Sequence, residues 1–75
     1  MTTTDPSPYL TREWQSTAEI AGRAWDAEGR RGHFGAARER VLIALRRMEA
    51  EGRAERMEAE RTSYRFAPTM WRRAE

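Results

Sequence analysis

Arginine is the residue type in this sequence that most clearly points to binding chemistry. All 14 basic residues are arginines, set against 12 acidic residues for a net charge of +2. Residues 29–48 hold six of them and a single glutamate: Arg30, Arg31, Arg38, Arg40, Arg46 and Arg47. A guanidinium group can bind phosphate, or the O6 and N7 atoms of guanine, through two hydrogen bonds. The block therefore indicates either an anionic partner such as nucleic acid or a solvated helix face.

The remaining polar residues show no pattern typical of catalysis or metal binding. There is one histidine, His33, and no cysteine, so thiolate zinc sites and disulfides are excluded. No motif pairs a serine with that histidine. The three glycines of residues 29–35 follow no predicted strand and lack the lysine of a phosphate-binding loop. We expect a protein that is not an enzyme and that uses neither a metal nor a cofactor.

Capping signals and apolar spacing predict three helices that would position the arginines. Ser7 followed by Pro8 predicts a short first helix of about two turns. Ser16 with Glu19 three residues later forms a capping box and predicts the start of a second helix. The third helix is predicted from Ala36 to about Glu51 and ends before Gly52. Its core stripe has the spacing i, i+3, i+4, i+7 and consists of Val41, Ala44, Leu45 and Met48.

After Gly52 the pattern changes to one typical of strands. Residues 53–57 and 62–67 alternate and predict a two-stranded hairpin closed by Pro68. We expect a disordered N-terminal tail over 1–7, one domain over 8–68 and a C-terminal tail over 69–75 that folds back through Met70 and Trp71. No apolar run approaches the roughly 20 residues of a membrane span, and the polar start is unlike a signal peptide. A cytoplasmic protein with no membrane partner is expected.

Three segments together resemble the winged helix-turn-helix DNA-binding domain of small bacterial and phage transcriptional regulators. They are STAEIA at 16–21, the segment from Val41 to Gly52 containing AL and MEAEG, and Arg56 followed by YRFAP at 64–68. The resemblance covers roughly residues 9–68. It implies a mainly α (α+β) fold, a three-helix winged helix-turn-helix with a C-terminal two-stranded β-hairpin wing.

The resemblance also implies a binding mode on double-stranded DNA. In this family the third helix enters the major groove by its N-terminal half and the wing touches adjacent backbone. The expected DNA-binding residues are Arg30, Arg31, Arg38, Arg40, Arg46 and Arg47 on the loop and third helix, and Arg56, Arg61 and Arg65 on the wing. A single module binds weakly, so we expect a homodimer on an inverted repeat, acting as a repressor or other transcriptional regulator.

Two aliphatic residues depart from the family pattern. Leu42 and Ile43 stand where relatives carry polar or basic residues. They could meet thymine methyl groups, pack under the long loop, or form a protein interface. The alternative function is therefore a winged-helix interaction module, such as a phage-encoded modulator of a host protein, that docks on another protein through these two residues.

Overall fold

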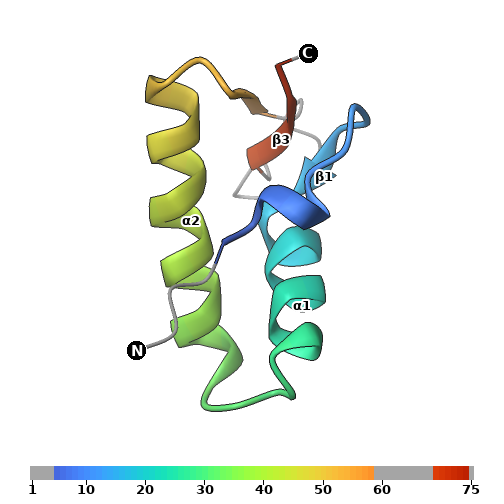
Figure 1. Cartoon of the computed structure of the whole chain (residues 1–75), viewed down its shortest axis with the longest axis vertical. Coiled ribbons are helices and arrows are strands. Elements are labelled where there is room, and N and C mark those ends of the chain that lie inside the picture. Colours follow the sequence, from blue (N-terminus) through green and yellow to red (C-terminus); the bar gives the residue numbers. More distant parts are fainter. Residues whose placement is uncertain (1–4, 59–68, 75) are drawn as a thin grey trace, which may run out of the picture.

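The computed structural model describes residues 5–58 and 69–74 of the chain. They form a small α+β fold in which two helices lie side by side and a three-stranded antiparallel sheet covers one end (Figure 1). In chain order the elements are the 3₁₀ helix η1 (Ser7–Tyr9), β1 (Gln15–Ser16), α1 (Thr17–Ala27), α2 (Phe34–Ala50), β2 (Ala54–Glu58) and β3 (Thr69–Arg73). Neither described helix is both long enough and apolar enough to cross a membrane.

The expected first α-helix is not formed, so the prediction of three helices is wrong. Ser7 and Pro8 begin only a single 3₁₀ turn, and Leu10 already has an extended backbone. Thr11 then makes a local turn, in which its hydroxyl accepts a hydrogen bond from the Glu13 amide at 3.2 Å. The segment has too few residues before β1 for a helix with a buried stripe. Leu10 instead fills the core from the end of the turn.

Helix α1 begins where the capping box predicts. The Ser16 hydroxyl accepts a hydrogen bond from the Glu19 amide at 3.1 Å, which satisfies one of the free N–H groups of the first turn. Ile20, Ala21 and Ala24 form its buried face. The small alanines allow α2 to approach closely.

Helix α2 begins two residues earlier than predicted, at Phe34. The Phe34 ring packs edge-on against Trp25 of α1, with the ring centroids 5.5 Å apart, and this contact orders the first turn. Val41, Leu45 and Met48 are buried as predicted, Ala37 joins them, and Ala44 is half-buried. The opposite face of α2 is turned to solvent.

The sheet differs from the predicted hairpin. Its order is β1-β3-β2, and β3 lies in the segment expected to be a C-terminal tail. Ala54 pairs with Arg73 and Glu58 with Thr69, so β2 is close to the predicted first strand. The predicted second strand, 62–67, lies outside the described residues. Strand β1 was not predicted, because two residues carry no detectable alternation.

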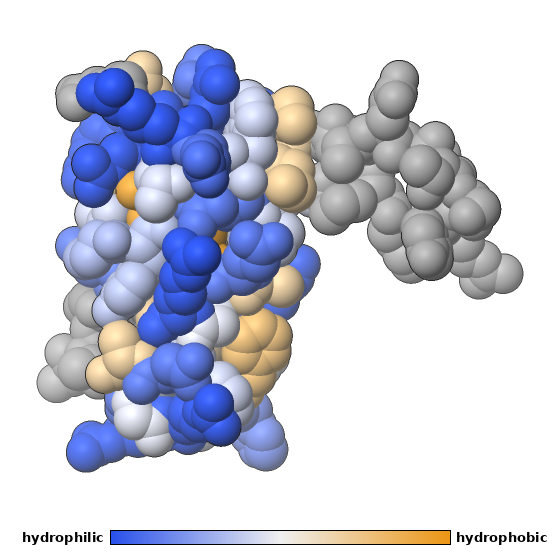
Figure 2. All heavy atoms as spheres, turned by 90° about the vertical axis from the view of Figure 1, so that its right-hand side faces the viewer, coloured by the Kyte–Doolittle hydropathy of each residue, from blue (hydrophilic) through white to orange (hydrophobic). Residues whose placement is uncertain are grey.

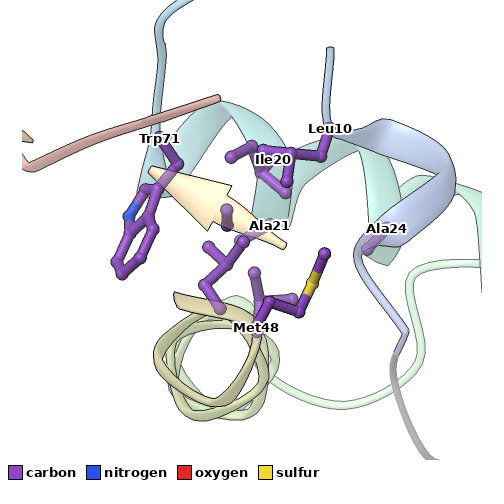
Figure 3. Close-up of a cluster of buried hydrophobic side chains, with 9 residues drawn as sticks. Leu10, Ile20, Ala21, Ala24, Met48 and Trp71 are labelled. Atoms are coloured by element: carbon purple, nitrogen blue, oxygen red, sulfur yellow. The ribbon is translucent and has the colours of Figure 1, made fainter. Parts of the chain in front are cut away.

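The core lies between the sheet, α1 and α2. Leu10, Ile20 and Trp71 come from three different segments and gather in one cluster with Met48 of α2 (Figure 3). Trp71 is completely buried. On the α1 side of the molecule, hydrophilic residues cover most of the described surface, and apolar residues form smaller patches, mainly along one edge (Figure 2).

Candidate nucleic-acid interface

The outer face of α2 is the strongest candidate for a functional surface. Since successive residues in a helix turn by about 100°, the side opposite Val41 presents Ala36, Glu39, Ile43 and Arg46, as the sequence predicts. All four are exposed, and so are the flanking Arg40 and Arg47. We refer to Ala36, Glu39, Arg40, Ile43, Arg46 and Arg47 as the outer face of α2.

Three arginines of α2 are available to an external anion. Arg38, Arg46 and Arg47 are exposed, and no carboxylate among the described residues forms an ion pair with them. Arg40 is exposed on the same helix. These guanidinium groups are therefore not part of the core, which α2 contacts through its buried residues.

The two loop arginines differ from each other. Arg30 has a positive φ of 58° and directs its Nε to Asp26 Oδ1 at 2.5 Å, while its guanidinium lies 5.6 Å from the Trp25 ring centroid. These contacts hold Arg30 against the end of α1. Arg31, next in the chain, is exposed. Of the loop pair, Arg31 thus fits the expected role better.

Arginines of the sheet are engaged in ion pairs at the surface. Arg56 Nε lies 3.1 Å from Glu49 Oε2, and Arg72 Nε lies 2.8 Å from Glu55 Oε1. Arg72 also stacks over the Trp14 ring, 4.4 Å from its centroid. Partly exposed pairs of this kind contribute only about 0.2–1 kcal/mol, so Arg56 can exchange its glutamate for phosphate at low cost. Arg61 and Arg65, also predicted on the wing, lie outside the described residues.

The structure separates the two aliphatic residues that the sequence treats as a pair. Leu42 is half-buried and packs against the hydrophobic core. Ile43 is 58% exposed, the largest exposure among the large hydrophobic residues described. Of the open explanations for the pair, core packing accounts for Leu42 but not for the exposure of Ile43.

A shallow hollow lies between the N-terminal segment and the second half of α2. Its wall combines charged and apolar residues: Asp5, Pro6, Ser7, Ala44, Arg47, Met48, Glu51 and Arg53. Hydrogen bonds from the Ser7 side chain and backbone hold the pKa of Asp5 below its ordinary value. The Ser7 hydroxyl in turn accepts a hydrogen bond from Arg53 at 3.3 Å. These polar groups of the hollow therefore bind one another.

Acidic and histidine side chains do not gather into a metal site within residues 5–58 and 69–74. His33 occupies the N-cap position of α2 and is exposed, and its side chain makes no capping hydrogen bond. The sequence did not predict the contacts of Arg72 with Trp14 and Glu55, because these contacts depend on the pairing of strand β3. Arg72 and Glu55 are opposite one another in the β2–β3 register.

No family model, no curated protein and no solved structure matches this chain. What the chain does must therefore be inferred from its own residues. The outer face of α2 and the arginines beside it carry that inference.

Proposed function

We propose that this chain is a small sequence-specific DNA-binding protein that regulates transcription. In this proposal it is a variant winged helix-turn-helix domain, in which the turn η1 takes the place of the first helix. Helix α2 enters the major groove by its N-terminal half, and the β2–β3 hairpin contacts the adjacent backbone. The order α1, loop, α2 and hairpin supports this arrangement.

The observation that carries the proposal is the exposure of Arg38, Arg46 and Arg47 without ion-pair partners among the described residues. A major groove about 12 Å wide admits one α-helix. Arg38 and Arg46 are separated by about 12 Å along the axis, given a rise of 1.5 Å per residue. Guanidinium groups at that spacing can reach base edges near the start of α2 and phosphates further along it.

Oligomeric state and location follow from the same proposal. One module of this size makes few contacts and binds weakly at physiological salt, so we propose a homodimer on an inverted repeat. The protein would act in the cytoplasm, at the bacterial nucleoid or in a phage-infected cell.

Selection from random duplexes followed by a gel-shift assay at two salt concentrations tests the proposal. We expect an enriched motif with dyad symmetry, and an affinity that falls steeply with salt because counterions are released from the phosphates. Replacing both Arg46 and Arg47 by alanine should weaken binding to all duplexes and lower the salt slope by about 1 for each lost phosphate contact.

Arg12→Ala, compared with the single variants Arg46→Ala and Arg47→Ala, is the matched control for the loss of one positive charge. Arg12 is exposed in the turn between η1 and β1. The segment that leads into β1 lies on the side of the molecule away from α2 (Figure 1). This variant should keep the affinity and salt slope of the original chain. The proposal is wrong if no duplex is enriched, or if the α2 double variant binds as tightly as the control.

The exposure of Ile43 favours a second candidate, a protein-interaction module. In that case the partner would be a protein with an apolar docking surface, and binding would depend little on salt. Ile43→Asp should then abolish binding, while the double replacement of Arg46 and Arg47 should leave it intact.

A further inference from the structure

The place of Ile43 on α2 distinguishes it from an ordinary exposed apolar residue. A single exposed isoleucine needs no explanation by itself. Ile43, however, lies at the middle of the 17-residue helix and on the side directly away from the buried Val41. Its neighbour Leu42, in contrast, is half-buried and packs against the core.

Two unpaired arginines flank Ile43 on either side. At about 100° per residue, Arg46 projects about 60° to one side of Ile43 and Arg47 about 40° to the other. Both are one turn further along the helix, and neither has an ion-pair partner among the described residues. A surface that fits this part of α2 is therefore apolar opposite Ile43 and anionic opposite Arg46 and Arg47. Glu39, one turn earlier on the Arg46 side, is the one acidic residue of the outer face.

A thymine-containing major groove has this chemistry. Phosphates line both edges of the groove, and the C5-methyl group of thymine is the apolar group on its floor. With Arg46 and Arg47 directed at opposite edges, Ile43 points at the floor between them.

We infer that Ile43 is a specificity-determining residue that contacts a thymine C5-methyl group. This inference rests on the proposed DNA-binding function and names one base that the helix reads. Because a methyl group carries no charge, its contribution to binding is independent of the phosphate contacts made by the arginines.

Replacing thymine by deoxyuridine tests the inference, since it removes only the methyl group and keeps the base pair. The enriched duplex would be made with deoxyuridine at one thymine position at a time, and its affinity measured by gel shift. We expect one or two positions in each half-site to lose about three- to fivefold in affinity, the effect of one buried methyl group. At those positions Ile43→Ala should bind the thymine and deoxyuridine duplexes equally.

Met57→Ala provides the matched control, because Met57 is the other large hydrophobic residue exposed in the described structure, on strand β2. It should keep the full discrimination between thymine and deoxyuridine. The inference is overturned, with DNA binding itself intact, if no thymine position responds or if Ile43→Ala retains the discrimination. If the protein binds no duplex at all, both the proposed function and this inference are wrong.

Discussion

Thr17 and Trp71 join the start of α1 to the middle strand of the sheet. The Trp71 indole N–H donates to the Thr17 hydroxyl oxygen at 2.8 Å inside the core. The Thr17 hydroxyl donates in turn to the Thr69 carbonyl at 3.5 Å. A buried indole needs such an acceptor, since an unsatisfied N–H in the interior is costly.

Thr17→Val should destabilise the protein by about 1–3 kcal/mol, because it leaves the buried N–H of Trp71 without an acceptor. Chemical denaturation followed by circular dichroism would measure the change in the free energy of unfolding. Thr69→Val is the control, since Thr69 contributes only its backbone carbonyl to this network and should change stability little. In a Trp71→Phe background Thr17→Val should cost clearly less, and an equal cost would contradict the proposed role of the hydrogen bond.

For individual residues, the sequence predicts solvent exposure better than it predicts which other residues they contact. A helical wheel is enough to place Ala36, Glu39, Ile43 and Arg46 on the solvent side of α2, and the structure confirms their exposure. It does not decide whether Leu42 is buried, because a residue 100° from the core stripe can lie on either side of the boundary between core and solvent. That boundary is set by what packs beside the helix.

Both helices end in the same way, at a glycine with a left-handed backbone. Gly29 and Gly52 have φ of 80° and 77°. The amide of the residue after each glycine donates to the carbonyl five residues earlier, Arg30 to Trp25 and Arg53 to Met48, both at 2.8 Å. This is the Schellman arrangement, and it satisfies carbonyls that the helix leaves free.

Gly52→Ala should therefore destabilise the protein by about 1–2 kcal/mol, through backbone strain alone. A Cβ atom at this position meets no other atom within 4 Å. Gly35→Ala makes the same chemical change in the first turn of α2, also in open space, and should stabilise by about 0.5 kcal/mol. Thermal unfolding of the two variants should shift in opposite directions, and a common direction would contradict this account.

Elements with local signals are predictable from the sequence, whereas elements that depend on distant pairing are not. The Ser16 cap and the two terminal glycines define α1 and α2 within about two residues. In contrast, β1 is an extended dipeptide until Trp71 and Met70 pair with it. The predicted second strand, based on the alternation of Tyr64 and Phe66, lies outside the described residues.

The stability of the whole molecule depends most on β3, the central strand of the sheet. It pairs with β1 on one side and with β2 on the other, and it contributes the fully buried Trp71. The domain boundary predicted after Pro68 would leave out this strand. A chain without it would retain two short, unpaired strands and a core lacking its largest side chain.

A chain truncated after Pro68 should consequently show no cooperative thermal unfolding, because a domain of this size has little stability in reserve. A chain that lacks only Glu75 should unfold as the original does. Thermal melting of both truncated chains, followed by circular dichroism, measures this difference. Cooperative unfolding of the shorter chain would show that helices α1 and α2 form a stable unit on their own.

The same topology has a consequence during biosynthesis. A ribosome delivers β1 and β2 first, yet the strand that must lie between them emerges after both. The newly made polypeptide therefore cannot assemble its sheet until residue 73 has left the exit tunnel. Until then Ile20 and Leu45 lack the Trp71 side chain, which belongs to the same core cluster. A chaperone that binds exposed apolar side chains can engage the nascent chain during this interval.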